Sequence, residues 1–153
     1  MRARDFMTRT RRRVFRRTSY RPTIRPTALV VDADAQQRDL IGILLAESGL
    51  DVIGVASSEE AVNVLRDSAR QIVLIVTAMN LPSFMDGPRL AIYAQQWPWI
   101  RVVVTSQDDD AAEGLPHPAV IMHKPWLPLN MLIQAEKAVA TGHNDLVIRP
   151  PMR

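Results

Sequence analysis

The sequence predicts a single α/β domain in which helices cover both faces of a five-stranded parallel sheet. Short apolar runs of strand length alternate along the chain with segments whose apolar residues recur at helical spacing. The most apolar run, residues 71–76, lacks polar alternation, which indicates a strand buried on both faces. A length of 153 residues fits one domain. Repeated β–α units of this kind fold into a parallel sheet between two helix layers.

The first half of the chain contains two strand–helix units. The predicted elements are a strand at 28–31, a helix at 35–48, a strand at 51–55 and a helix at 58–69. Gly49 stands where a helix stop is expected. Ser57 and Glu60 have the spacing of a capping box, which marks the start of the second helix.

The second half continues the alternation with one weaker unit. The predicted elements are strands at 71–76, 101–104 and 119–122 and helices at 88–96 and 128–140. Pro98 ends the helix of residues 88–96, and Gly142 ends the last helix. Pro116 and Pro118 leave little room for a full helix between the fourth and fifth strands, so we expect a shortened fourth helix there.

Charge divides the chain into a basic N-terminal segment and an acidic body. Residues 1–27 hold ten arginines and one acid, a net charge of +9, and the remaining nine basic and fifteen acidic residues give −6. We expect a disordered Arg-rich tail at 1–27, a globular domain at 28–141 and a flexible C-terminal tail at 142–153. The basic segment is open to three interpretations: a solvated extension or upstream start codon, an arm that binds nucleic acid or anionic lipid through Arg9 to Arg25, or an organelle transit peptide.

Composition excludes several classes of function. The chain has no cysteine, which rules out disulfides, thiolate metal sites and thiol catalysis. No apolar run approaches the ~20 residues of a transmembrane helix. We therefore expect a soluble cytoplasmic protein without a transmembrane segment.

Polar residues follow the predicted strands at the edge where parallel sheets carry their functional groups. The residues at these strand ends are Asp32, Ala33 and Asp34, then Thr77 and Ala78, then Thr105 and Ser106, and finally Lys124. Chemistry is expected among these residues.

Four short motifs at these positions resemble the receiver domain of bacterial two-component response regulators. They are Val30-Val31-Asp32, Asn80-Leu81-Pro82 followed by Asp86-Gly87, Val104-Thr105, and His123-Lys124-Pro125-Trp126. The resemblance extends from about Ala28 to Ala140. It implies a flavodoxin-like doubly wound sheet with the strand order 2-1-3-4-5.

The resemblance also implies roles for individual residues. In the family, two adjacent acids after the first strand hold Mg²⁺, and an aspartate at the end of the third accepts a phosphoryl group. A hydroxyl and a lysine then contact the phosphoryl oxygens. Asp32 matches the first acid, Thr105 the hydroxyl and Lys124 the lysine. The second acid falls on Ala33 and the phosphoacceptor on Ala78.

The two alanines imply a pseudo-receiver that lacks the phosphoacceptor. A methyl group cannot form an acyl phosphate, and Mg²⁺ prefers carboxylate ligands. We therefore expect no enzymatic activity, no cofactor, weak or absent Mg²⁺ binding, and a remnant pocket formed by Asp32, Asp34, Thr105 and Lys124. Lys124 is expected to pair with Asp32, and Asp34 either assists in the pocket or caps the first helix.

Three functions follow as hypotheses. The first is phosphorylation-independent binding of a histidine kinase, a phosphotransfer protein or another response regulator. Its expected contact surface consists of Gln36, Gln37, Asp39, Leu40, Pro125, Trp126 and Leu127. The second is phosphatase activity, since the Asp32-Ala33-Asp34 motif resembles the haloacid dehalogenase family, although Gln36 stands where that family usually has Thr or Val. The third is recruitment to nucleic acid or membrane through the Arg-rich tail.

Overall fold

The computed structural model describes residues 25–148 except 83, 108–114 and 117, and for 142–148 it describes the backbone alone. The elements, in chain order, are β1 (Thr27–Val31), α2 (Ala35–Glu47), β2 (Asp51–Val55), α3 (Ser58–Ser68), the 3₁₀ turn η1 (Ala69–Gln71), β3 (Ile72–Ala78), α4 (Gly87–Ala94), β4 (Arg101–Ser106), β5 (Val120–His123) and α5 (Pro128–Ile148).

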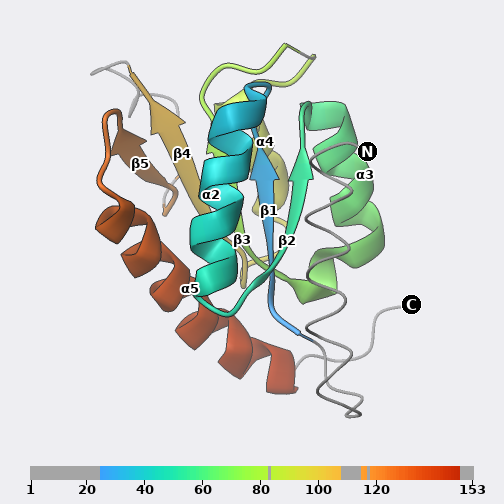
Figure 1. The fold of residues 1–153 in the computed structure, drawn as a ribbon. Coiled ribbons are helices and arrows are strands. Elements are labelled where there is room, and N and C mark those ends of the chain that lie inside the picture. Colours follow the sequence, from blue (N-terminus) through green and yellow to red (C-terminus); the bar gives the residue numbers. More distant parts are fainter. Residues whose placement is uncertain (1–24, 83, 108–114, 117, 149–153) are drawn as a thin grey trace, which may run out of the picture.

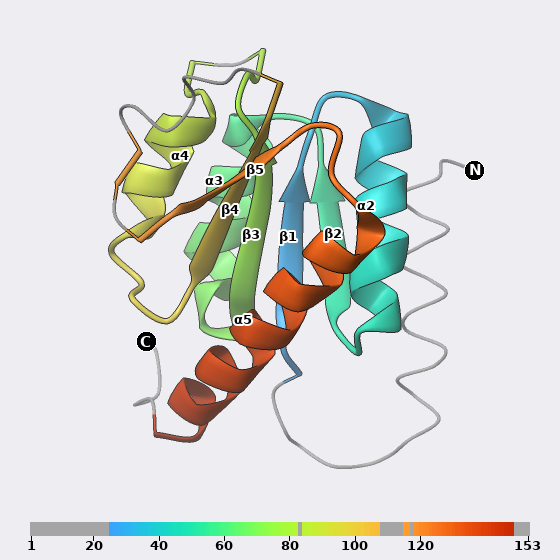
Figure 2. The same cartoon turned by 90° about the vertical axis from the view of Figure 1, so that its left-hand side faces the viewer.

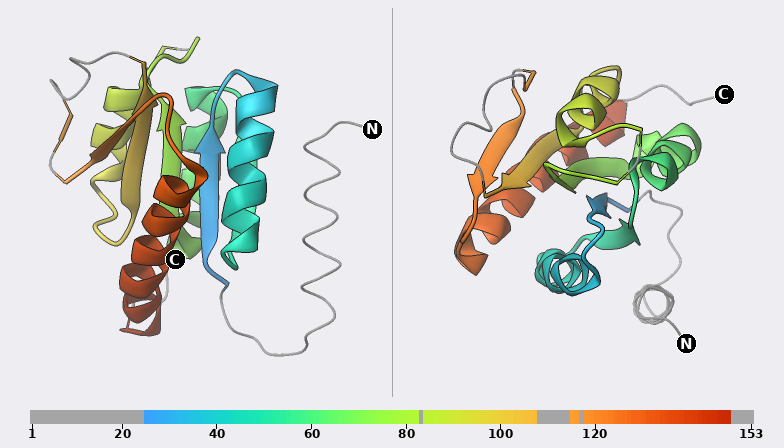
Figure 3. Two further views of the ribbon diagram at one scale, coloured as in Figure 1. Left: turned by 60° about the vertical axis from the view of Figure 1, so that its left-hand side comes forward. Right: turned by 90° about the horizontal axis from the view of Figure 1, so that it is seen from above.

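The strands form one parallel sheet in the order β2-β1-β3-β4-β5, which confirms the predicted fold class (Figure 1). α2 and α5 cover one face of the sheet, and α3 and α4 cover the other, as the turned views show (Figures 2 and 3). β5 pairs with β4 only from Val103 onward. The first two residues of β4, Arg101 and Val102, therefore have no neighbouring strand on the β5 side among the described residues.

Alternate residues of the central strands supply two separate apolar cores. On β1, Ala28 and Val30 pack with buried residues of α2 and α5, whereas Leu29 and Val31 pack with those of α3 and α4. All four side chains are fully buried. Burial on both faces explains why the strand sequences read as continuous apolar runs.

Side-chain caps stabilise the first turns of α3 and α4. Ser57 Oγ accepts a hydrogen bond from the Glu60 amide at 3.2 Å, and Asp86 Oδ1 accepts one from the Arg89 amide at 3.0 Å. The predicted cap of α3 is thus confirmed. Gly49, which follows α2, has φ of +92°, a conformation that glycine adopts without steric cost.

The element boundaries differ from prediction mainly at two places. β3 and β4 continue beyond the predicted ends at Val76 and Val104, so that Ala78 and Thr105 lie within paired strands. α5 continues through Gly142 to Ile148, and the expectation of a loose tail from 142 is wrong for 142–148. Glycine inside a helix costs only about 1 kcal/mol relative to alanine, and no proline occurs before Pro150 to stop the helix.

The predictions for the termini and for the fourth helix fall mostly outside the described residues. The basic segment 1–24 and residues 149–153 are not described. Arg25 is the last arginine of the Arg-rich tail predicted at 1–27. Its guanidinium forms an ion pair of 3.6 Å with the Asp51 carboxylate at the start of β2. The described residues between β4 and β5 include no helix, and the short helix expected there falls on 108–114, outside the description. Among the described helices, none has the length and hydropathy needed to cross a membrane.

Candidate functional site

A cavity of about 440 Å³ opens at the carboxyl ends of β1, β3, β4 and β5. It is lined by Asp32, Ala78, Met79, Asn80, Thr105, Ser106, Gln107 and Lys124. Four separate strands or their following loops contribute these residues, because parallel strands all end at this edge. Asp32, Ala78, Thr105 and Lys124, which were predicted to lie together, are indeed brought together.

Asp32 is the carboxylate of this cavity, and it is only 6% exposed. Its Oδ1 accepts a hydrogen bond from the Asp34 amide at 2.9 Å, whereas its Oδ2 is buried without a hydrogen-bond partner. Burial raises the pKa of Asp32 above the ordinary value, since desolvation disfavours the charged form. The hydrogen bond from the Asp34 amide and the positive charges of Lys124 and Arg38 oppose this shift in pKa.

Arg38, which was not predicted from the sequence, contacts the backbone of Asp32. One of its guanidinium nitrogens donates a hydrogen bond of 2.7 Å to the Asp32 backbone carbonyl. The side-chain stem crosses β2 at Gly54, where an added Cβ would lie 3.3 Å from Arg38 Cγ. A glycine in the edge strand β2 was the available signal, since it permits the close approach of another chain segment.

Ala78 lies in register with Thr105 on the adjacent strand, and both line the cavity. The Thr105 side chain is 1% exposed, and its Oγ1 is buried without a hydrogen-bond partner. Thr77 does not line the cavity; its hydroxyl donates a 3.0 Å hydrogen bond to the Ala78 carbonyl. Thr77 therefore does not take the place of Ala78 in the cavity wall.

Lys124 reaches the cavity from the end of β5. Its amide donates a 2.7 Å hydrogen bond to the Ser106 carbonyl, which fixes the loop to β4, and its peptide bond to Pro125 is cis. The expected ion pair between Lys124 and Asp32 is absent from the described residues, so that prediction is wrong. The two charges act on each other only at longer range, which leaves both groups available to the cavity.

Asp34 has a local role. Its Oδ1 accepts hydrogen bonds from the Gln36 amide at 2.9 Å and the Gln37 amide at 3.3 Å, so it caps α2. It does not line the cavity, which corrects its inclusion in the remnant pocket. Of the two roles considered for Asp34, the structure supports the cap. An acid/base role of the kind that a phosphatase requires has no geometric support.

The loop after β3 is held against the start of α4 by a close backbone contact. The Gly87 amide donates a 2.8 Å hydrogen bond to the Met79 carbonyl. A Cβ at Gly87 would overlap the Ala78 carbonyl oxygen and approach two Met79 backbone atoms at 3.0 Å. Glycine at this position therefore allows the loop to place Ala78 and Met79 at the cavity wall.

The predicted partner surface lies beside the cavity. A second, apolar hollow of about 590 Å³ is lined by Gln37, Leu40, Gln107, Lys124, Pro125, Trp126 and Pro128. Leu40 and Leu127 are 44% and 66% exposed, although both are large apolar side chains. Trp126 is partly buried and packs against the core of the α2–α5 face. Of the seven residues predicted for the partner surface, Gln37, Leu40, Pro125 and Trp126 line this hollow, whereas Gln36, Asp39 and Leu127 do not; the binding role stays a prediction.

The donor set of the first cavity sets limits on its chemistry. It offers the carboxylate of Asp32, the ammonium group of Lys124, the buried hydroxyls of Thr105 and Ser106, and the side-chain amides of Asn80 and Gln107. Among the described residues, no group of three or more acidic or histidine side chains could hold a metal ion. A single carboxylate beside an ammonium group fits Mg²⁺ poorly, because this ion prefers an octahedral shell of oxygen ligands.

No protein-family model matches the sequence, and no curated protein matches it. Solved structures do match the fold. A response regulator receiver domain from Clostridium thermocellum has a TM-score of 0.69 and 20% identity, with 80% of this chain and 99% of that chain covered. The signal receiver domain of an HD domain-containing protein from Pseudomonas fluorescens Pf-5 has a TM-score of 0.70 and 23% identity, with 86% and 99% covered.

A response regulator receiver protein from Sinorhizobium medicae WSM419 matches with a TM-score of 0.70 and 21% identity, with 77% of this chain and 97% of that chain covered. At these identities the likeness concerns the fold. The chain therefore has the flavodoxin-like fold of response regulator receiver domains.

Proposed function

We propose that this protein is a receiver-like component of a two-component signalling pathway that binds its partner without being phosphorylated. The observation that carries the proposal is the methyl group of Ala78 at the end of β3. By the resemblance to receivers, this is the position of the phosphoacceptor aspartate. A methyl group provides no nucleophile for phosphoryl transfer.

Asp32 does not replace the missing nucleophile. It lies on β1's carboxyl end, its Oδ1 is occupied by the Asp34 amide, and burial raises its pKa. By the resemblance to receivers, this position is that of the first acid of the Mg²⁺ site, and the acceptor position is the one at the end of β3 that Ala78 occupies. On this proposal, the cavity lacks a carboxylate at the position of the phosphoacceptor, so phosphorylation does not regulate the protein.

The contact surface proposed for the partner combines α2 with the loop that follows β5. Leu40 on α2 lines the hollow together with Trp126, and Leu127, the residue after Trp126, also exposes an apolar side chain. Ile43 on α2 is 52% exposed and lies one helical turn beyond Leu40. An exposed apolar strip of this kind suits an amphipathic helix, such as one from a histidine kinase or a phosphotransfer protein.

Binding to purified kinases and phosphotransfer proteins from the source organism tests the proposal. We expect Leu40→Glu and Leu127→Glu to weaken binding by about tenfold or more, because each places a charge in a desolvated apolar contact. Ile92→Glu is the matched control, since Ile92 is 51% exposed on α4, which covers the opposite face of the sheet. Equal loss with all three variants, or no binding by the unmodified protein, would contradict the proposal.

A further inference from the structure

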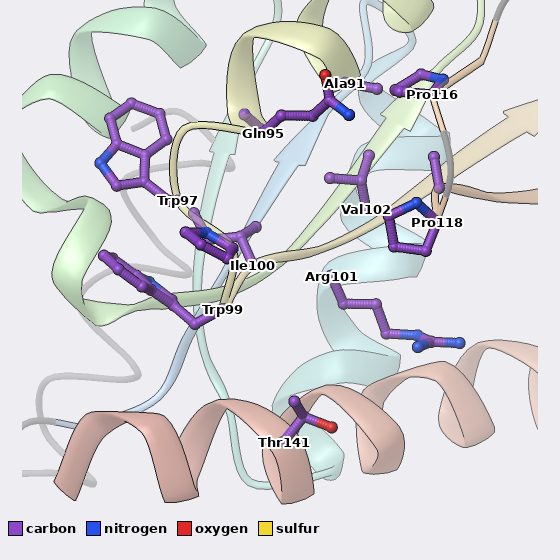
Figure 4. A pocket seen from close by; sticks show the side chains of 13 residues that line it. Ala91, Gln95, Trp97, Trp99, Ile100, Arg101, Val102, Pro116, Pro118 and Thr141 are labelled. Carbon is purple, nitrogen blue, oxygen red and sulfur yellow. The ribbon is translucent and has the colours of Figure 1, made fainter. Parts of the chain in front are cut away.

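A third cavity, of about 380 Å³, lies away from the Asp32 cavity, near the amino end of β4 (Figure 4). It is bounded by the end of α4, the turn at residues 95–100, the start of β4, the prolines before β5 and one residue of α5. The lining residues are Ala91, Ala94, Gln95, Trp97, Pro98, Trp99, Ile100, Arg101, Val102, Pro116, Pro118, Ala119 and Thr141.

The cavity exists because β5 is shorter than β4. The ladder between these strands begins at Val103 and Val120. Among the described residues, no strand pairs with Arg101 and Val102 on this side, and both line a recess between the end of α4 and Thr141 of α5. A volume of this size is in the range of cavities that take small molecules, which is about 300–1,000 Å³.

The aromatic wall is held in place by contacts behind it. The Trp99 indole N–H donates a 3.1 Å hydrogen bond to the Ala69 carbonyl of η1. Trp97 packs edge to face against Tyr93, with ring centroids 5.5 Å apart. Figure 4 shows both indoles on one side of the cavity and Pro118 on the other. Because these rings are fixed by the fold, a ligand would not have to order them on binding.

Arg101 is the charged residue of this lining. Its Nε donates a 2.8 Å hydrogen bond to Gln134 Oε1 on α5, which orients the guanidinium at the border of the cavity. It forms no ion pair with any described carboxylate. The remaining guanidinium N–H groups match a carboxylate in a bidentate geometry, which a compact ammonium group cannot offer.

We propose that this cavity binds a small carboxylate with an apolar, preferably aromatic, body. The body would pack against the apolar lining at Ile100, Val102 and the prolines, and the carboxylate would pair with Arg101. The combination of a mostly apolar wall with one fixed charged group is typical of small-molecule sites, in which the polar group selects the ligand. This proposal is independent of Ala78 and of the partner surface.

Titration of the full chain with phenylpropanoate tests the proposal, with phenylpropanamide and acetate as comparison ligands. The three tryptophan indole N–H signals are followed by proton–nitrogen NMR. Saturable shifts at Trp97 and Trp99, with Trp126 unchanged, are expected for phenylpropanoate. The amide should bind about tenfold more weakly or worse, because it lacks the charge that Arg101 pairs with. Acetate should shift neither signal, because it has no apolar body.

Two variants locate the binding. Arg101→Gln should weaken phenylpropanoate binding by about tenfold or more, whereas Arg89→Gln on the exposed side of α4 should leave it unchanged. Thr141→Phe keeps the charge but fills the cavity from the exposed surface of α5, and it should also weaken binding. Equal affinity for acid and amide, equal shifts at Trp126, undiminished binding by Arg101→Gln, or no binding by the unmodified chain would each overturn the proposal.

Discussion

Ala78 and Thr105 are paired across β3 and β4, so that a methyl group and an unpartnered buried hydroxyl line the same cavity. Asp32 Oδ2 is a second buried oxygen without a partner in this cavity. Buried polar atoms are normally hydrogen-bonded, and leaving one unpaired costs about 1–3 kcal/mol. The cavity thus holds two buried oxygen atoms without hydrogen-bond partners, while the side chain at the end of β3 is a methyl group.

Incubation with a phosphoryl donor tests whether the cavity can be phosphorylated with alanine or only with aspartate at position 78. We expect no covalent phosphoryl adduct on the unmodified protein after incubation with acetyl phosphate and Mg²⁺, as measured by intact mass. Ala78→Asp supplies a carboxylate beside Thr105, Lys124 and Asp32, and it should gain an adduct. Thr77→Asp is the matched control, since Thr77 does not line the cavity. An adduct on the unmodified protein would refute phosphorylation-independent function.

The non-covalent capacity of the same cavity is tested with Mg²⁺ and beryllofluoride, a phosphoryl mimic. Trp126 lies near Lys124, and both line the adjoining hollow, so its fluorescence reports on the site. We expect no saturable change in the unmodified protein and a saturable change in Ala78→Asp, because a second carboxylate improves the donor set for Mg²⁺. A Trp126→Phe variant isolates the signal from that of Trp97 and Trp99. Saturation in the unmodified protein would show that the cavity still accepts phosphoryl-like ligands.

The raised pKa of Asp32 gives the stability a defined pH dependence. The folded protein holds the Asp32 proton more tightly than the unfolded chain does. Its contribution to the free energy of unfolding therefore falls as pH rises from the ordinary value of 3.8 through the raised pKa. Asp32→Asn removes the buried charge and keeps an oxygen for the Asp34 amide.

We expect Asp32→Asn to be more stable than the unmodified protein by about 1 kcal/mol near pH 7, with the difference shrinking towards about pH 4. Urea unfolding at both pH values measures it, and Asp39→Asn on α2 serves as the control. A variant that is less stable at neutral pH, or a difference that grows on acidification, would show that Lys124 and Arg38 outweigh the desolvation of Asp32.

The capping role of Asp34 predicts a loss of stability without a change at the cavity. Asp34→Ala should lower the free energy of unfolding by about 1 kcal/mol, because the amides of Gln36 and Gln37 lose their acceptor. Asp34→Ser retains a capping oxygen and should recover most of the loss. Urea unfolding of the two variants distinguishes them. If both are equally destabilised, the carboxylate charge rather than the cap is responsible.

Gly87 should tolerate no side chain. Gly87→Ala directs a Cβ into the Ala78 carbonyl, and both are backbone-fixed, so we expect a loss of about 1–3 kcal/mol in the free energy of unfolding. Arg89→Ala, on the exposed side of the same helix, should change stability little. Thermal unfolding of the two variants measures the difference. Equal stability of Gly87→Ala and the unmodified protein would mean that the β3–α4 loop can move away from Ala78.

Sequence patterns were enough to predict the succession of strands and helices along the chain, the cap of α3 by Ser57, and the residues at the strand ends. These features depend on local patterns: apolar runs of strand length, helical spacing and side chains that bond to nearby amides. The parallel sheet then brings Asp32, Ala78, Thr105 and Lys124 to one edge, because β–α–β connections return each strand in the same direction.

Which of those residues interact depends on the packing of the folded chain. Asp34 turns to the α2 amides, Lys124 remains apart from Asp32, and Arg38 reaches the Asp32 carbonyl across Gly54. The cavity at Arg101 likewise depends on where β5 stops pairing with β4. Each outcome is set by distances of a few ångströms between segments far apart in the sequence, and periodicity and composition carry no information about such distances.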